Sequence, residues 1–156
     1  MKETIKLLVS IVLCQGAGII GSFFTTPNIS TWYKNLIKPA FAPPNWLFAP
    51  VWTLLFLLMG IALFLVWKRG WQNPPVRVAM TVFFIHLVVN ILWSAVFFGL
   101  RSPIAGFFVI IALWLLIVLT IIYVSNVSKL AGVLLIPYLV WVSFASVLNF
   151  MIYRLN

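Results

Sequence analysis

The sequence predicts an all-α integral membrane protein, a bundle of five transmembrane helices that residues 1–156 form as a single domain. Composition is the first reason, because 65% of the residues are hydrophobic and only 7% are charged, against about 25% charged residues in soluble domains. Pattern is the second, because long apolar runs alternate with charges and prolines. This few polar residues could not cover the surface of a soluble monomer. We therefore expect the lipid bilayer as a partner.

Each predicted helix has close to the 20 apolar residues that cross the bilayer core. The five helices are expected at residues 7–24, 46–67, 78–100, 104–124 and 130–153. Three of the connections are short, which places successive helices antiparallel and side by side. The first connection, residues 25–45, is long and holds four prolines, so we expect a stiff loop over one end of the bundle.

The N-terminal segment has features of a signal peptide, since Lys2 and Lys6 precede an apolar run that reaches Cys14. Leu13 stands before that cysteine, where a small residue is expected, and the apolar run continues to Phe24. We therefore expect a retained first helix. Six of the ten basic residues fall on the N-terminal side of the bundle, which favours a cytoplasmic N-terminus.

The scarcity of chemical groups excludes most enzyme classes. The chain has one carboxylate side chain (Glu3), one histidine (His86) and one cysteine (Cys14). Paired carboxylates, a Ser-His-Asp triad, a multi-ligand metal site and a pump with an intramembrane carboxylate all lack their residues. Because these ligands and catalytic groups are missing, we expect no metal and no required cofactor. The basic residues stand singly rather than in a patch, so we also expect no nucleic-acid partner.

Helical spacing gathers aromatic and polar residues on single faces of the predicted helices. The third helix aligns His86, Asn90, Trp93 and Phe97, and the fifth aligns Tyr138, Trp141, Ala145 and Asn149. The second aligns Trp52, Phe56 and Met59, and the first aligns Gln15, Gly18 and Ser22. One interpretation is that the polar groups tie helices together, each tie being worth about 0.6 kcal/mol. The other is a ligand pocket with apolar walls and a few convergent polar groups. His86 alone is more typical of an interhelical hydrogen bond than of a haem ligand.

Small residues and one proline predict how the helices pack. Ala17 with Gly21, and Ala95 with Gly99, form small faces that let another helix come close, either within the chain or in a homodimer. Pro137 interrupts the fifth helix and predicts a kink there, because it removes a backbone hydrogen bond.

An ordered set of motifs runs through nearly the whole chain: Trp32-Tyr33, Pro43-Pro44-Asn45-Trp46, Pro50-Val51-Trp52, Asn90-Ile91-Leu92-Trp93-Ser94, Phe97-Phe98-Gly99, and Pro137-Tyr138-Leu139-Val140-Trp141. With these stretches the sequence resembles the tryptophan-rich sensory protein and translocator protein family (TspO/MBR, also called the peripheral-type benzodiazepine receptor).

The resemblance implies a five-helix bundle, often a homodimer, with a pocket beneath the first loop that binds porphyrins and benzodiazepine or isoquinoline drugs. It also implies a bacterial cell membrane. By motif match, the implied pocket residues are Tyr33, Pro43, Trp52, Asn90, Trp93, Pro137, Trp141 and Ala145. The helix-face argument adds His86. Relatives often carry proline where this chain has Ala95, so we expect a straighter third helix here.

Three functions are open at this point. The first is a membrane receptor or sensor for porphyrin-like tetrapyrroles, with porphyrin or haem as the ligand and Lys34 and Lys38 near its carboxylates. The second is a transporter of such ligands, which is disfavoured because no intramembrane carboxylate and no inverted repeat is visible. The third is light- and oxygen-dependent porphyrin degradation, with Trp52 and Trp141 as the catalytic residues that the resemblance implies.

Overall fold

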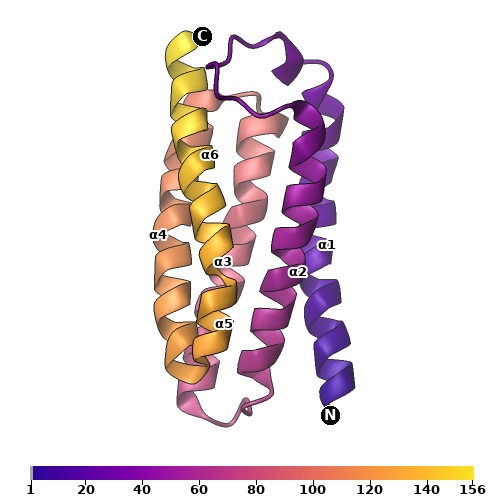
Figure 1. The fold of residues 1–156 in the computed structure, drawn as a ribbon, viewed down its shortest axis with the longest axis vertical. Coiled ribbons are helices and arrows are strands. Elements are labelled where there is room, and N and C mark those ends of the chain that lie inside the picture. The colour runs from indigo at the N-terminus through magenta and orange to yellow at the C-terminus, as the bar shows by residue number, and fades with distance from the viewer. Residues whose placement is uncertain (1) are drawn as a thin grey trace.

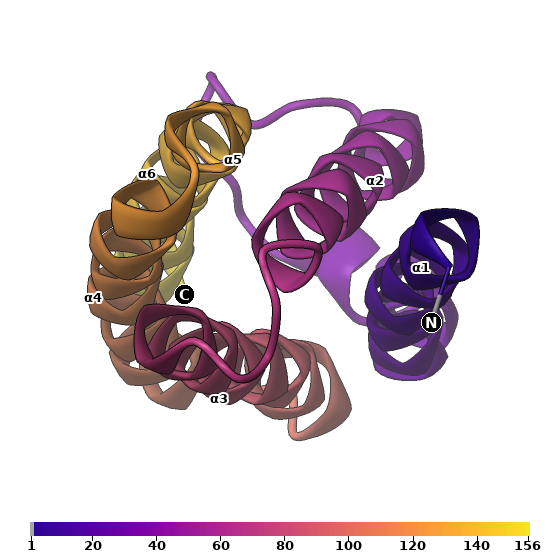
Figure 2. The ribbon, with the colours of Figure 1, turned by 90° about the horizontal axis from the view of Figure 1, so that it is seen from below.

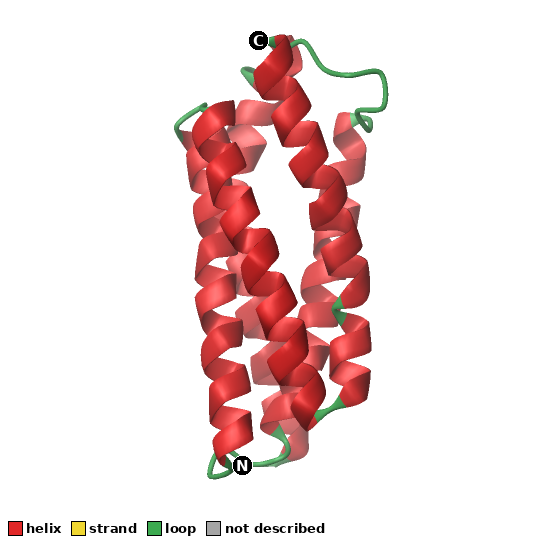
Figure 3. Ribbon diagram, turned by 90° about the vertical axis from the view of Figure 1, so that its left-hand side faces the viewer, coloured by secondary structure: helices red, strands yellow, loops and turns green. Residues whose placement is uncertain are grey.

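The computed structural model describes residues 2–156, and every regular element in that range is a helix (Figure 3). Five helical segments are long and apolar enough to cross a membrane, which confirms the predicted fold class. The α-helices are α1 (Glu3–Ile29), α2 (Phe48–Trp67), α3 (Pro74–Ser94), α4 (Pro103–Val127), α5 (Lys129–Leu134) and α6 (Ile136–Leu155). Shorter turns are η1 (Tyr33–Asn35), η2 (Asn45–Leu47) and η3 (Ala95–Gly99).

The first helix is longer than predicted, since α1 runs past Phe24 to Ile29 despite Pro27. Polar side chains in and after its last turn donate hydrogen bonds back to the helix. The Asn28 amide donates to the carbonyl of Phe24 at 2.7 Å, and the Thr31 hydroxyl donates to that of Pro27 at 2.7 Å. Because the Thr31 bond satisfies a carbonyl that the helix end leaves open, it stabilises the last turn of α1 in a polar segment.

The last span is divided at Leu135, where α5 ends and α6 begins, and Figure 3 shows the division as a short stretch of loop. Pro137 lies in the first turn of α6, where its missing N–H costs nothing. The N–H of Leu135 donates to the carbonyl of Gly132 at 3.1 Å, which closes the end of α5. The irregularity predicted from Pro137 is confirmed as a break between two helices.

The end of the third span is not the regular helix expected from Ala95. Residues Ala95–Gly99 form a π-helical turn, in which the N–H of Leu100 donates to the carbonyl of Ala95 at 2.9 Å. Whether the third helix is straighter than in relatives stays a prediction. The wider turn changes the angular spacing of side chains, and as a result the consecutive Phe97 and Phe98 are both buried.

The helices surround a central space in the order α1, α2, α5 with α6, α4 and α3 (Figure 2). The loop between α1 and α2 lies at the same end as the C-terminus, and the N-terminus lies at the opposite end (Figure 1). Residues 30–44 form most of this loop.

Small residues bring α1 close to both of its neighbours. A Cβ added at Gly60 of α2 would lie 2.8 Å from the Cα of Ile11, and one at Gly21 of α1 would lie 3.3 Å from the Ser94 hydroxyl. A Cβ at Gly99 would lie 3.0 Å from the ring of Phe24. The predicted packing of small faces within the chain is confirmed, and the homodimer stays a prediction.

Candidate ligand-binding cavity

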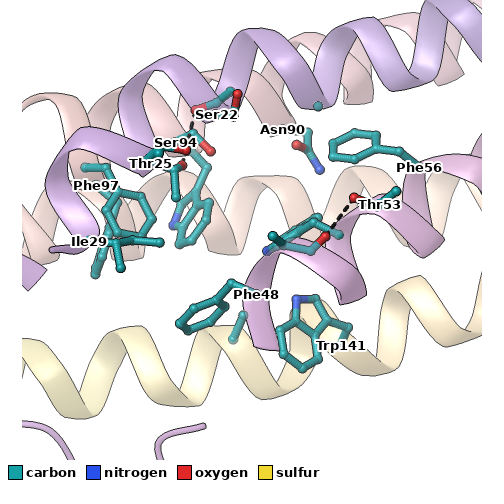
Figure 4. Close-up of a pocket in the computed structure, with 18 of the residues that line it drawn as sticks. Ser22, Thr25, Ile29, Phe48, Thr53, Phe56, Asn90, Ser94, Phe97 and Trp141 are labelled. Carbon is teal, nitrogen blue, oxygen red and sulfur yellow. Dashed lines mark hydrogen bonds between the residues drawn. The ribbon is translucent and has the colours of Figure 1, made fainter. Parts of the chain in front are cut away.

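A cavity of about 300 Å³ lies between α1, α2, α3 and α6, beneath the loop of residues 30–44. Its lining side chains come from all four helices, and Figure 4 shows the labelled ones around a common space. The volume is at the lower end of the range for sites that bind small organic ligands, about 300–1,000 Å³. Many of the lining residues are aromatic, among them Phe48, Trp52, Phe56, Trp93, Phe97 and Trp141.

Three tryptophans give the cavity flat walls in two orientations. The rings of Trp52 and Trp93 are 6.4 Å apart and inclined by only 30°, whereas Trp52 and Trp141 are 6.4 Å apart and nearly perpendicular, at 89°. Trp93 also stacks on Phe97, at 5.3 Å and 22°. Such surfaces favour a flat, largely apolar ligand, since aromatic rings pack face to face or edge to face.

Several polar groups in and beside the cavity connect helices. The Asn90 amide of α3 donates to the Tyr138 hydroxyl of α6 at 2.6 Å. The Trp93 indole N–H donates to the Asn149 carbonyl oxygen at 3.1 Å, and the Asn149 amide donates to the backbone carbonyl of Pro103 at 2.8 Å. The interhelical role considered for these polar residues is therefore present. Asn90 and Trp93 nevertheless line the cavity as well.

Two residues of the cavity wall have a hydrogen-bond donor with no acceptor among the described residues. The Tyr33 hydroxyl and the Trp141 indole N–H are buried and have no partner among the described residues. Burial raises the pKa of Tyr33 to about 12, so its hydroxyl stays protonated near neutral pH. Both residues line the cavity, but their polar atoms are covered by neighbouring side chains, as are polar atoms of Ser10 and His86 elsewhere in the bundle, so the missing partners do not by themselves point to a ligand.

The structure brings six of the nine predicted ligand-binding residues to the cavity wall: Tyr33, Trp52, Asn90, Trp93, Trp141 and Ala145. The predicted first-helix face of Gln15, Gly18 and Ser22 also lines it. Whether these residues bind a ligand stays a prediction.

The other three predicted residues, Pro43, His86 and Pro137, do not line the cavity. His86 is fully buried one helical turn from Asn90, on the side away from the loop, and its Nδ1–H donates to the carbonyl of Phe83 at 2.6 Å. Pro137 lies one turn before Trp141, again away from the loop. Pro43 is a half-buried loop residue.

The lysines expected near ligand carboxylates also lie outside the cavity lining. The ammonium of Lys38 donates to the backbone carbonyls of Tyr33, Lys34 and Leu36, at 3.0, 3.3 and 3.1 Å. It also lies 4.8 Å from the centroid of the Tyr33 ring. Lys38 therefore stabilises the loop conformation, while the Lys34 side chain is exposed.

Some lining residues were not predicted. Phe98 reaches the wall because of the π-helical turn, which regular helical spacing does not reveal. Phe48 is the first residue of α2, and Thr25 and Ile29 belong to the end of α1 that extends beyond the predicted helix. The only signal for the α1 residues was the continuation of the first helix face at helical spacing beyond Ser22.

Comparisons with known proteins agree with this architecture. The sequence model of the TspO/MBR family matches residues 10–154. The chain is 50% identical over 155 residues to the tryptophan-rich protein TspO of Chlorobaculum tepidum, covering 99% of this chain and 98% of that protein. It is 51% identical over 152 residues to the protein of the same name from Archaeoglobus fulgidus, covering 97% of each. It is 33% identical over 138 residues to the translocator protein of Homo sapiens, covering 88% of this chain and 82% of that protein.

Proposed function

The chain belongs to the TspO/MBR family of integral membrane proteins, and we propose that it is a receptor or sensor for porphyrin-like tetrapyrroles and related flat hydrophobic ligands. The ligand would occupy the aromatic cavity between α1, α2, α3 and α6. Two relatives are named as a sensory protein and a translocator protein, and sensing is the function that we propose for this chain.

The observation that carries the proposal is the cavity itself, whose wall combines three tryptophans with polar side chains such as Asn90. A tetrapyrrole offers a flat apolar face to Trp52 and Trp93, and its carboxylates would accept from the Tyr33 hydroxyl and the Trp141 indole N–H once these side chains turn toward it. Asn90 lines the same space, and the oxygen of its amide can accept from a pyrrole N–H. Because the cavity is small, we expect one edge of the macrocycle to remain in its open side.

Titration of the purified protein with protoporphyrin IX, followed by tryptophan fluorescence, tests this proposal. We expect saturable quenching, because three tryptophans line the cavity. Trp114 of α4 provides a matched control, since it is not a lining residue and its indole N–H is bonded to Ser143 at 2.8 Å. Trp141→Phe should weaken binding, whereas Trp114→Phe should leave the dissociation constant unchanged. Quenching that rises linearly without saturation would refute the receptor proposal.

One arrangement favours a second activity at the same site. Trp52 and Trp141 stand perpendicular to each other with ring centroids 6.4 Å apart in the cavity wall, so both can contact one bound macrocycle. We propose light- and oxygen-dependent porphyrin degradation as the alternative function, in which the illuminated porphyrin is oxidised, molecular oxygen is the oxidant that is reduced, and these tryptophans relay the electron between them. The assay is loss of the porphyrin absorption band under illumination. If Trp52→Phe with Trp141→Phe leaves the rate of loss per bound porphyrin unchanged, this activity is not a property of the site.

A further inference from the structure

We infer that the ligand enters the cavity sideways from the bilayer, through an opening between α1 and α2, and not from water through the loop. The inference rests on the proposed function, since it concerns the route of the ligand to that cavity. It implies that ligands are selected before they bind by how strongly they partition into lipid.

The exposed part of the cavity wall lies on two helices only. Of all the lining residues, those that are exposed are Ile19 and Thr26 of α1 and Ala49 and Thr53 of α2. Every lining residue of α3, η3 and α6 is buried or half-buried. The cavity is therefore open along the seam between α1 and α2 and closed on its other sides.

This opening, which we call the α1–α2 portal and define by the same four residues, runs from the loop ends of α1 and α2, where Thr26 and Ala49 lie, down to the level of the hydrocarbon core at Ile19. Ile19 is ten residues from the end of α1 and therefore about 15 Å from it, at 1.5 Å per residue. The side chain of Ile19 is 58% exposed, and the nearby apolar side chains of Phe23 and Leu54 are 71% and 55% exposed. In a membrane these surfaces contact lipid chains, so the portal faces lipid.

The portal has a defined lower edge. The Gln15 amide of α1 donates to the carbonyl of Thr53 in α2 at 3.0 Å, joining the two helices. One turn further along α1, a Cβ added at Gly18 would lie 2.7 Å from the ring of Phe56, so the helices are in close contact there. The seam is thus closed on the side away from the loop.

Two hydroxyls in and beside the portal are bonded within their own helices. The Ser22 hydroxyl donates to the carbonyl of Ile19 at 2.6 Å, and the Thr53 hydroxyl donates to that of Ala49 at 2.7 Å. Both hydroxyls use their protons within their own helices, so neither donates to a ligand on its way in. A hydrophobic molecule can pass without first breaking hydrogen bonds across the seam above Gln15.

The loop end of the cavity is closed and fastened. Tyr33 is the one lining residue from residues 30–44, and it is only 1% exposed. Its ring packs edge-on against Phe48 at 5.9 Å and lies 5.8 Å from that of Phe98. The side chain of Asn156 accepts from the N–H of Ile37 at 3.0 Å and donates to its carbonyl at 2.8 Å, which ties the loop to α6. Entry from water would require these contacts to open.

Stopped-flow measurements on the protein in phosphatidylcholine nanodiscs test the route, with tryptophan quenching by protoporphyrin IX as the signal. Ala49→Phe places a ring in the portal, and Leu54→Phe is the matched control because it adds a ring to a lipid-facing residue of α2 outside the cavity lining. Asn156→Ala releases the loop from Ile37. Each variant is measured for both association and dissociation rate constants, at two ratios of lipid to protein.

We expect Ala49→Phe to lower both rate constants together, by roughly tenfold, because an obstructed passage raises one barrier that is crossed in both directions. Leu54→Phe and Asn156→Ala should leave both unchanged, and the association rate should follow the concentration of porphyrin in the bilayer. Faster exchange in Asn156→Ala with no change in Ala49→Phe would overturn the inference in favour of the loop route. Faster dissociation alone in Ala49→Phe would also overturn it, by making residue 49 part of the bound site. Both results leave saturable binding intact, whereas the loss of saturation in the unaltered protein contradicts the proposed function itself.

Discussion

Replacement of Asn90 by leucine is the sharpest test of the cavity, because this residue has a structural and a potential binding role at once. Its amide donates to the Tyr138 hydroxyl at 2.6 Å, joining α3 to α6, and the residue also lines the cavity. Tyr138 is 1% exposed and does not line the cavity, so its own replacement affects only the first role. The pair Asn90→Leu and Tyr138→Phe therefore separates the two roles.

The expected magnitudes follow from this geometry. Both replacements remove the same interhelical hydrogen bond, so each should lower stability by about 0.6–2 kcal/mol, the range for such bonds in membranes. Asn90→Leu also removes one of the side-chain amides that line the cavity, the others being those of Gln15 and Asn149. One hydrogen bond left unmade in a dry site should weaken ligand affinity by a further 1–2 kcal/mol, or roughly 5- to 30-fold.

The assay measures thermal unfolding in detergent and protoporphyrin affinity on the same preparations. We expect Tyr138→Phe to lose stability and keep its affinity, and Asn90→Leu to lose both. Phenylalanine preserves the ring contacts of residue 138 with Trp52 and His86, at 6.4 and 5.5 Å, so the packing around the bond is retained. Equal loss of stability with unchanged affinity in both variants would refute the reasoning and make Asn90 a purely structural residue.

Two further predictions concern packing. Ala145→Thr should weaken ligand binding by about 1–3 kcal/mol, the usual cost of overpacking. Thermal stability should change little, because the new hydroxyl can donate to the carbonyl of Trp141. Affinity equal to that of the unaltered protein would show that Ala145, which is 8% exposed, does not contact the ligand. Gly60→Ala should lower the unfolding temperature, because its Cβ would lie 2.8 Å from the Cα of Ile11, a backbone atom. Gly16→Ala is its control, since nothing lies within 4 Å of that Cβ, and it should stabilise α1 by about 0.5–1 kcal/mol. A similar unfolding temperature for the two glycine variants would contradict the close approach of α1 and α2.

The number and order of helices were predictable because lipid leaves the backbone few alternatives. Within the hydrocarbon core every backbone N–H and C=O must bond within the segment, so each long apolar run becomes a helix whatever its side chains prefer. Ends were harder, because they lie where water and side chains compete for the backbone. α1 continues through Pro27, and the Thr31 side chain satisfies one of its last carbonyls, a local effect that apolar runs do not encode.

The cavity residues were predictable as far as helical faces define them, and no further. Asn90 and His86 lie on one face of α3, but four residues separate them, about 6 Å along the axis. A face runs the whole length of a helix, whereas the cavity occupies only the part nearer the loop. The depth of the cavity along the axis depends on how far neighbouring helices diverge, and this excluded His86 and Pro137 from the wall.

That divergence has a cause in side-chain size. Away from the loop, α1 touches α2 through glycine, at Gly60, where the contact reaches the backbone of Ile11. Toward the loop, the positions of α2 that face inward carry Phe48 and Trp52, whose rings hold the helices apart and form the cavity wall. A small residue at the far end and large rings at the near end make the seam between α1 and α2 widen toward the loop. The same gradient in side-chain size therefore produces both the cavity and its opening toward lipid. A larger residue at position 60 should loosen the contact between α1 and α2 away from the loop without filling the cavity. A smaller residue at position 52 should collapse the cavity without loosening that contact.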